Sequence, residues 1–483
     1  MEYGKWNIYG EWIITKLLFP ALRKRTKCAI FNSAMTLRTR KSIYYLFFIL
    51  FFVVGAYLLM VTQGLVFDWA KFRVVKTGGI YLRTIPPNAS ILINKKPYQS
   101  ESGFLSRGTF VSNLLPDTYH VEVFFPGYRD WQKDITVENG LVASASQIKL
   151  WKENYPETKI ASSSIKDFFF TNKGLILQMD DGELNFNGTA LKGTSIVANS
   201  PDSAETVTED AKGNYLLTDL GNLKSSLNVT SLFTSLYKRT FIATSTPEIV
   251  DIALHPFSTS KLLIAADNGM YLLDVKKIQL EQSVALPLTN RLIMTDNEVF
   301  AADAKGNFFG TNLLLSTSAY FSVATTSVAN VKANQSGTKF FVLEKNGTLF
   351  EYNRGTGTST VIAEKIKDFY LGPDEKRLAL VDNDNTIKIY YLTETTGDLH
   401  IPQGSSIPII IPNILKNSNI KLTWLPDTLN YLLVAVNGDI FSAEVDPRAP
   451  ENSYLLFSHI KKYTLDGALY LLKNDGSLVT VIL

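Results

Sequence analysis

The sequence KFFVLEKNGTLFEY, residues 339–352, places two apolar runs on either side of a Lys-Asn-Gly turn. Asn-Gly is a strong short signal for a β-hairpin, because both central residues of a type I′ turn need positive φ. The same unit, a strand, a tight polar turn and a second strand, occurs eight times after Trp151. The eight copies are residues 174–186, 205–219, 261–275, 298–312, 339–352, 377–392, 432–445 and 468–483.

A further apolar strand precedes each hairpin, and a candidate outer strand follows most of them. Four strands in about 41 residues are typical of one blade of a β-propeller. Residues 152–483 are therefore predicted to form an eight-bladed propeller, or a seven-bladed one if the short first unit (165–192) belongs to the last blade; two stacked β-sandwiches are the alternative. The candidate outer strands include RTFIAT (239–244), TVIAE (360–364), IPIIIP (407–412) and SYLLFS (453–458).

Turns such as Ser200-Pro201-Asp202 and Gly372-Pro373-Asp374 follow the first strand of several units. In this respect the repeats resemble the WD-like and TolB-like propeller families, a generic likeness that implies architecture only. The last unit has three strands before Leu483, so its fourth strand must come from elsewhere. We expect a segment between Gln147 and Ile160 to pair there, because closing the ring removes exposed sheet edges.

Residues 78–151 also follow the period of two that is typical of strands, with Pro and Gly turns between short runs. We expect a small β-sandwich there. The predicted strands are residues 78–85, 88–94, 109–114, 119–125, 130–137 and 144–150.

Several short motifs in this region resemble the PEGA domain family. They are Gly79 to Leu82, Pro86 to Ile93, the turn Leu115-Pro116-Asp117-Thr118-Tyr119, Pro126-Gly127-Tyr128, and Trp131. The namesake motif departs from the family, because it reads Pro87-Asn88-Ala89 without the glycine. The resemblance implies an extracytoplasmic β-sandwich without enzymatic activity, and it transfers no binding residues.

The apolar run IYYLFFILFFVVGAYLLMV, residues 43–61, contains no charged residue. About 20 such residues span the hydrocarbon core of a membrane, so residues 43–62 are predicted to be a transmembrane helix that contacts the lipid bilayer. Residues 1–42 carry nine Lys and Arg against two Glu, and this bias places them in the cytoplasm. Residues 63–77 are predicted to be a juxtamembrane linker in which Trp69 and Phe72 anchor at the interface.

The segment before the apolar run has several interpretations. The part from Trp6 to Phe19 is either an interfacial amphipathic helix or a disordered stretch, and translation starts at either Met1 or Met35. Cys28 is the only cysteine of the chain, so the exported part has no disulfide framework. The chain after residue 42 has a net charge of −4, which argues against a nucleic-acid partner.

The sequence contains no catalytic or metal-binding motif that we can identify. No two of the four histidines, His120, His255, His400 and His459, have the spacing of metal ligands. Asp382-Asn383-Asp384-Asn385 offers alternating oxygen ligands, but it lacks the downstream glutamate of a calcium-binding loop. We therefore predict no catalytic, cofactor or metal site.

The order of anchor, sandwich and propeller favours a single-pass cell-envelope protein that acts as a non-enzymatic binding scaffold. Its partner would be an envelope protein or a glycan. The alternatives are a structural envelope spacer and, less favoured, a hydrolase or lyase with an active site in the propeller channel.

Overall fold

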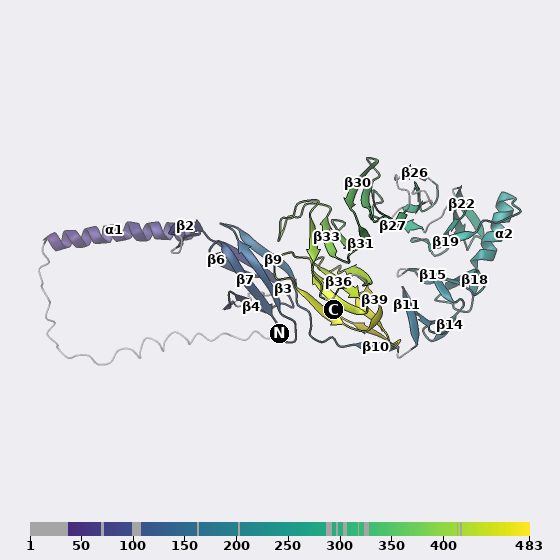
Figure 1. Ribbon diagram of the computed structural model, residues 1–483, viewed down its shortest axis with the longest axis horizontal. Helices are drawn as coiled ribbons and strands as arrows, with labels where there is room; N and C mark the ends of the chain where they lie inside the picture. The colour runs from purple at the N-terminus through teal and green to yellow at the C-terminus, as the bar shows by residue number, and fades with distance from the viewer. Residues whose placement is uncertain are drawn as a thin grey trace, which may run out of the picture. The chain divides into compact units, whose positions relative to one another are not determined.

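The computed structural model describes most of the chain from Leu37 onward (Figure 1). The residues expected in an N-terminal amphipathic helix, Cys28 and Trp69 lie outside the described residues. The chain divides into two compact units, Met1–Val66 and Phe67–Leu483. The described ranges are 37–68, 72–98, 108–161, 164–200, 203–285, 292–295, 298–302, 307–316, 318–322, 328–412, 414–415 and 418–483.

Helix α1, Leu37–Thr62, is long and apolar enough to cross a membrane. None of its residues is buried against the rest of the chain. The helix begins six residues before the predicted span and so includes Arg38, Arg40 and Lys41. A helix can continue past its apolar core because its hydrogen bonds are internal, and charged side chains at its end reach the polar headgroup region.

Two sheets follow a short two-stranded sheet of β1 (Leu65–Asp68) and β2 (Arg73–Lys76). The first has the strand order β6-β3-β9, in which β3 and β9 are parallel; the second has the order β5-β4-β7-β8 and is antiparallel. We call these two sheets the two-sheet module. Its strands are β3 (Gly78–Ile85), β4 (Ser90–Ile93), β5 (Lys96–Tyr98), β6 (Thr109–Leu114), β7 (Asp117–Phe124), β8 (Trp131–Val137) and β9 (Val142–Lys149).

The two-sheet module encloses one hydrophobic cluster to which both sheets contribute. Ile80 and Leu82 come from the first sheet, and Val121, Val123 and Ile135 come from the second; each is at most 1% exposed. The alternation predicted from the sequence is present in β8, where buried residues alternate with more exposed ones. The resemblance to the PEGA family stays a prediction.

The remaining described strands form eight four-stranded antiparallel sheets, which we call blades 1 to 8. Blades 1 and 2 are β11 (Ile165–Thr171), β12 (Gly174–Met179), β13 (Leu184–Phe186), β14 (Thr189–Leu191), and β15 (Ser195–Asn199), β16 (Glu205–Glu209), β17 (Tyr215–Asp219), β18 (Ser226–Asn228). Blades 3 and 4 are β19 (Ile249–Leu254), β20 (Lys261–Ala266), β21 (Gly269–Asp274), β22 (Gln279–Ala285), and β23 (Ile293–Met294), β24 (Glu298–Ala302), β25 (Asn307–Asn312), β26 (Ser318–Ser322).

The other four blades have the same order of strands. Blades 5 and 6 are β27 (Val328–Ala333), β28 (Lys339–Glu344), β29 (Leu349–Asn353), β30 (Thr358–Ala363), and β31 (Ile366–Leu371), β32 (Arg377–Asp382), β33 (Ile387–Tyr391), β34 (Ser406–Ile409). Blades 7 and 8 are β35 (Ile420–Trp424), β36 (Tyr431–Val436), β37 (Asp439–Glu444), β38 (Ser453–Phe457), and β39 (Ile460–Asp466), β40 (Ala468–Lys473), β41 (Leu478–Val481), β10 (Thr158–Ala161).

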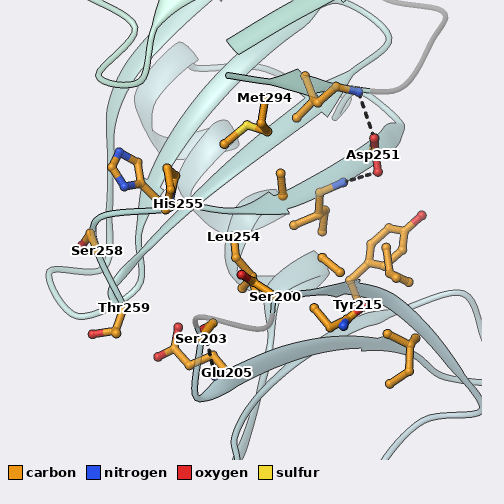
Figure 2. A pocket seen from close by; sticks show the side chains of 18 of the residues that line it. Ser200, Ser203, Glu205, Tyr215, Asp251, Leu254, His255, Ser258, Thr259 and Met294 are labelled. Atoms are coloured by element: carbon orange, nitrogen blue, oxygen red, sulfur yellow. Dashed lines mark hydrogen bonds between the residues drawn. The ribbon is translucent and has the colours of Figure 1, made fainter. Parts of the chain in front are cut away.

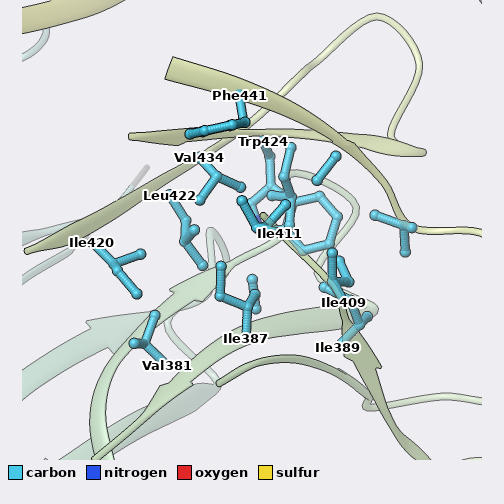
Figure 3. Packing of buried hydrophobic residues seen from close by; sticks show 14 of the residues in the cluster. Val381, Ile387, Ile389, Ile409, Ile411, Ile420, Leu422, Trp424, Val434 and Phe441 are labelled. Carbon is cyan, nitrogen blue, oxygen red and sulfur yellow. The ribbon is translucent and has the colours of Figure 1, made fainter. Parts of the chain in front are cut away.

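Each blade packs its face against the next through a shared hydrophobic cluster. Between blades 6 and 7, Ile387 and Ile389 contact the layer of Leu422, Trp424 and Val434 (Figure 3). Similar clusters join all the other neighbours. Blade 8 also shares a cluster with blade 1, in which Ile165 and Phe168 meet Leu472 and Leu478. The described blades therefore form a closed ring, a β-propeller.

The fourth strand of blade 8 comes from the chain before blade 1. Strand β10 pairs with β41, with Thr158 opposite Thr480 and Lys159 opposite Val479 (Figure 1). This confirms the expectation that a segment ahead of the first blade completes the last one, and it gives eight blades rather than seven.

The prediction of an outer strand at 239–244 was wrong. Residues 239–241 are the last turn of helix α2 (Val229–Phe241), and the outer strand of blade 2 is β18. Asn228 caps the helix, because its side chain accepts a hydrogen bond of 2.8 Å from the backbone N–H of Ser231. Val229, Phe233 and Leu236 recur at helical spacing and are all buried, so tertiary packing outweighs the β-propensity of the stretch.

The two-sheet module contacts blade 7 through a buried ion pair. Lys133 of β8 and Glu444 of β37 lie 3.3 Å apart, with side chains 0% and 3% exposed. The indole N–H of Trp131 donates to Glu444 Oε1 at 2.9 Å, and the Asn452 amide donates to Oε2 at 2.7 Å. Burial raises the pKa of the Glu444 carboxyl, and Lys133 opposes this effect. The pair therefore needs both partners to remain charged.

Replacing Lys133 with methionine should destabilise the protein strongly. The substitution leaves Glu444 buried without its cation, which typically costs about 3–5 kcal/mol. The double variant Lys133→Met/Glu444→Gln should recover part of the loss, because it leaves no uncompensated charge. The measurement is urea unfolding followed by tryptophan fluorescence.

The control for this comparison is Lys339→Met, which removes the partially exposed pair of Lys339 and Glu351 (39% and 20% exposed side chains). We expect it to cost less than about 1 kcal/mol. A Lys133→Met variant as stable as this control would contradict the structural role of the buried pair.

Candidate functional site

The first strand of each blade lies nearest the axis of the ring. The first strands of neighbouring blades approach one another, as β11 does β15 and β15 does β19. Two cavities are lined by the first strands of three successive blades each, β15, β19 and β23 in one and β27, β31 and β35 in the other. These strands therefore surround a common space, which we call the channel.

Six of the first strands carry a β-bulge near their start. In three of them the residue at the bulge is an aspartate: Asp167, Asp251 and Asp368. Each of these carboxylates accepts a hydrogen bond of 2.7 to 2.9 Å from the backbone N–H of the next residue. A bulge re-aims side chains locally, and the aspartate satisfies the N–H group that follows it.

The bulge residues also connect neighbouring blades. The Lys462 ammonium of blade 8 donates to Asp167 of blade 1, and the Asn330 amide donates to Asp368 Oδ1 at 3.3 Å. The backbone N–H of Leu292 donates to Asp251 Oδ2 at 3.0 Å. These carboxylates hold the inner rim of the ring together.

A cavity of about 1160 Å³ lies on the channel wall between blades 2, 3 and 4. Figure 2 shows Glu205 and Ser203 on one side of this cavity and Asp251 and Met294 on the other. Its lining is mainly polar and includes the loop 255–260 between β19 and β20. We call it the blade 2–4 cavity.

Glu205 is the ionisable group of this cavity with the most perturbed acidity. Burial raises the pKa of its carboxyl to about 7, Asp219 adds to the rise, and Lys276 opposes it. Among the described residues, its carboxylate has no hydrogen bond of its own, although its backbone N–H donates to Ser203 Oγ at 3.0 Å. Near neutral pH this carboxyl can both donate and accept hydrogen bonds to a ligand.

Phe257 gives the rim of the blade 2–4 cavity an apolar surface. Its side chain is 72% exposed, although the neighbouring His255 is buried. The backbone N–H of Phe257 donates to His255 Nδ1 at 3.2 Å. Burial, followed by the charge of Lys261, lowers the pKa of His255. The neutral imidazole therefore holds the loop that presents Phe257.

The structure does not bring the other histidines into this cavity. His120 is partly exposed and its Nδ1 lies 2.7 Å from Asp134 Oδ1 in the two-sheet module, while His400 contacts Glu394 at 3.2 Å in the β33–β34 connection. His459 precedes β39 and has positive φ. Within the described residues there is no group of three or more metal-ligating side chains.

The turn from Asp382 to Asn385 uses its polar side chains to hold itself and the next connection. Asp382 Oδ1 accepts the backbone N–H groups of Asp384 and Thr386 at 3.0 and 2.8 Å. The Asn385 amide donates to the carbonyls of Leu415 and Ser418 at 2.8 and 3.2 Å. These contacts agree with the interpretation of this stretch as a hairpin turn.

A second cavity on the channel wall, of about 540 Å³, lies between blades 5, 6 and 7. Its polar groups are paired with one another: the hydroxyl of Tyr370 donates to Asp368 Oδ2 at 2.8 Å, and the indole N–H of Trp424 donates to the Tyr370 carbonyl at 3.2 Å. The blade 2–4 cavity is the better candidate, because it is larger and Glu205 is not committed.

Sequence reasoning did not single out Glu205 or Phe257. One feature of the sequence could have singled out Phe257, namely that an aromatic residue directly follows His255-Pro256 in a predicted turn. Glu205 had no such feature, since its environment depends on Asp219 and Lys276, which approach it only in the folded sheet.

No protein-family model and no curated protein sequence matches this chain. Among solved structures, it is similar to BamB from Moraxella catarrhalis, with a TM-score of 0.44, 11% identity, and coverage of 68% of this chain and 98% of that chain. It is also similar to the computationally designed Ika8 protein (TM-score 0.43, 14% identity, 68% and 98% coverage). Kluyveromyces lactis Hsv2 is similar at a TM-score of 0.41, with 11% identity and 61% and 98% coverage. At these scores the fold rests on the strand pairing described above.

Replacing Glu205 with glutamine should stabilise the protein at high pH only. The folded chain keeps the Glu205 proton up to about pH 7, whereas the unfolded chain loses it near the ordinary glutamate pKa of 4.5. This carboxyl therefore lowers stability as pH rises between those values. We expect Glu205→Gln to raise the thermal midpoint at pH 8 and to leave it unchanged at pH 4.

The control is Glu183→Gln, in an exposed hairpin turn of blade 1. It should show the same small difference from the parent at both pH values. Equal midpoint shifts at pH 4 and pH 8 for Glu205→Gln would contradict the raised pKa.

Proposed function

We propose that this protein is a membrane-anchored, non-enzymatic binding scaffold of the cell envelope. Helix α1 supports the anchor, because it is apolar, 26 residues long and has no buried residue. Arg38, Arg40 and Lys41 at its N-terminal end support an orientation with the N-terminus in the cytoplasm and the propeller outside. The lipid bilayer would then contact residues 43–62.

The two-sheet module is proposed to be a PEGA-like sandwich. Its two sheets enclose one core, and its turns keep the order of the motifs that resemble this family. In this proposal the module links the anchor to the propeller along the chain, and it contacts blade 7 through the buried pair of Lys133 and Glu444.

The observation that carries the binding role is the blade 2–4 cavity with its exposed rim residue Phe257. Aromatic side chains, phenylalanine among them, are enriched at the core of protein–protein interfaces. Two other ionisable groups of the cavity, Asp251 and His255, support binding rather than catalysis, because their side chains have structural hydrogen bonds. Asp251 accepts two backbone N–H groups, and His255 accepts the N–H of Phe257.

The test is crosslinking on intact cells with a membrane-impermeant reagent, followed by isolation of the full-length protein. We expect Phe257→Ala to lower the yield of a crosslinked envelope partner by about fivefold, the effect of losing about 1 kcal/mol of binding. Because Phe257 is 72% exposed, the substitution should change the unfolding free energy of the protein by less than about 0.5 kcal/mol.

The matched control is Val361→Ala, a residue 60% exposed on the outer strand β30, which should crosslink like the parent. No crosslinking of the propeller from outside would contradict the proposed orientation. Failure to isolate any partner, with a weakened envelope when the gene is deleted, would favour the structural spacer. Equal yields of crosslinked partner for the parent and Phe257→Ala would show that the partner does not bind at the blade 2–4 cavity.

A further inference from the structure

Four consecutive blades of the ring begin their first strand with the dipeptide Ile-Lys. The isoleucines are buried and the lysines are exposed in every copy. The lysines are Lys367 in blade 6, Lys421 in blade 7, Lys461 in blade 8 and Lys166 in blade 1. First strands of successive blades run in the same direction, so these four lysines lie at one end of the channel. We call them the lysine arc.

The contacts of these side chains extend around the ring from blade to blade. Lys367 Nζ lies 3.1 Å from Asn385 Oδ1 and 3.1 Å from the carbonyl of Ser418, which leads into blade 7. Lys421 Nζ lies 4.9 Å from the ring centre of Tyr463 in blade 8. Lys367 and Lys421 therefore each reach toward the following blade.

The pKa of Lys421 also depends on the charge of Lys462 in the next blade. Although Lys421 is partly exposed, desolvation by the surrounding protein lowers its pKa, the charge of Lys462 in blade 8 lowers it further, and Asp167 opposes both. Lys462 itself pairs with Asp167 and lies 4.8 Å from the ring centre of Phe169. Lys421 of the arc therefore lies within the field of a further cation, Lys462, whose charge Asp167 compensates.

Positive charge exceeds negative charge on this half of the channel. The first strands of blades 6, 7, 8 and 1 carry five lysines and three aspartates. Asp466 is the last residue of β39, at the opposite end of that strand from Lys461, so only Asp167 and Asp368 lie near the lysines. Both carboxylates already have partners, Lys462 for one and Asn330 with Tyr370 for the other. The described first strands of the other blades carry one aspartate and one lysine.

The turns between the second and third strands lie on the same side of the ring as the arc, and acidic side chains in these turns bond to their own backbone. Asp181 accepts the N–H of Glu183 at 2.9 Å, and Asp475 accepts the N–H of Ser477 at 2.8 Å. Among the described residues, Lys166 and Lys461 have no carboxylate within ion-pair distance.

Lys367 and Lys421 have contacts within the propeller, but the stability of the propeller does not explain the exposed Lys166 and Lys461, because exposed like charges destabilise a folded protein slightly. A row of cations at one level is suited to a ligand that presents several anions in succession. We propose that the lysine arc binds an extended polyanionic chain, with phosphate or carboxylate groups along its length. The proposal rests on the proposed function only in taking the propeller as the binding part.

The experiment measures binding of two labelled probes, a short polyphosphate and polygalacturonate, to the full chain in detergent micelles by fluorescence anisotropy. The variant is Lys166→Gln/Lys461→Gln, which changes two exposed lysines. We expect its affinity to fall about tenfold or more, and the slope of log affinity against log salt to decrease by about 1 for each lysine removed.

The matched control is Lys212→Gln/Lys345→Gln, two exposed lysines in the turns between second and third strands of blades 2 and 5. It should bind like the parent. Loss of polyphosphate alone indicates a phosphate-bearing chain, and loss of polygalacturonate alone a carboxylated one; either supports the arc. Absence of binding by the parent, or equal losses in the control, overturns it.

The same assay separates this proposal from that of the blade 2–4 cavity. Phe257→Ala should bind both probes as tightly as the parent, because Phe257 belongs to blade 3 and not to the arc. If the probes bind normally but no envelope partner is crosslinked, the binding role proposed for the blade 2–4 cavity is rejected and the one proposed for the lysine arc is retained. The reverse pattern would reject the arc alone.

Discussion

The pairing of β10 with β41 is the constraint on which the rest of the propeller depends. Eight sheets arranged in a ring leave no exposed edge at the junction only if the last sheet receives its fourth strand from the chain ahead of the first. Here that strand is Thr158–Ala161, and the cluster of Ile165, Phe168, Leu472 and Leu478 seals the same junction. The closure therefore joins residues more than 300 positions apart in the sequence.

The closure also determines where the two-sheet module lies within its unit. The segment between β9 and β10 is short, and Trp151 at its start packs against Tyr431 of blade 7 in the cluster between blades 7 and 8. The module consequently contacts blade 7, and Lys133 enters a site formed by Glu444 and the carbonyls of Asp446 and Arg448. A buried charge of this kind adds little net stability, but it discriminates strongly against other registers of docking.

Local signals in the sequence were sufficient to predict the blades, but they were not sufficient to predict the candidate sites. Turns such as Lys345-Asn346-Gly347 predicted the hairpins correctly, and the incomplete last unit predicted the closing strand. Residues 239–241 were assigned to a strand because their apolar content was considered without the helical spacing of Phe233 and Leu236. Glu205 and the Lys133–Glu444 pair carry no local signal, since their partners are distant in sequence. The Ile-Lys dipeptides can be seen in the sequence. Only the closed order of the blades, in which blade 8 is followed by blade 1, places their four lysines next to one another along the ring.

The most direct test of the account is a disulfide across the closing junction. In a chain with Cys28→Ser, the substitutions Thr158→Cys and Thr480→Cys place cysteines at residues that face each other in the strand pair. Cα atoms of such neighbours are about 4.5–5.5 Å apart, within disulfide range. We predict an intramolecular disulfide under mild oxidation, detected as one linked peptide by mass spectrometry, and none for a Thr158→Cys/Thr348→Cys control. Two free thiols, or intermolecular bonds only, would contradict a ring closed by β10.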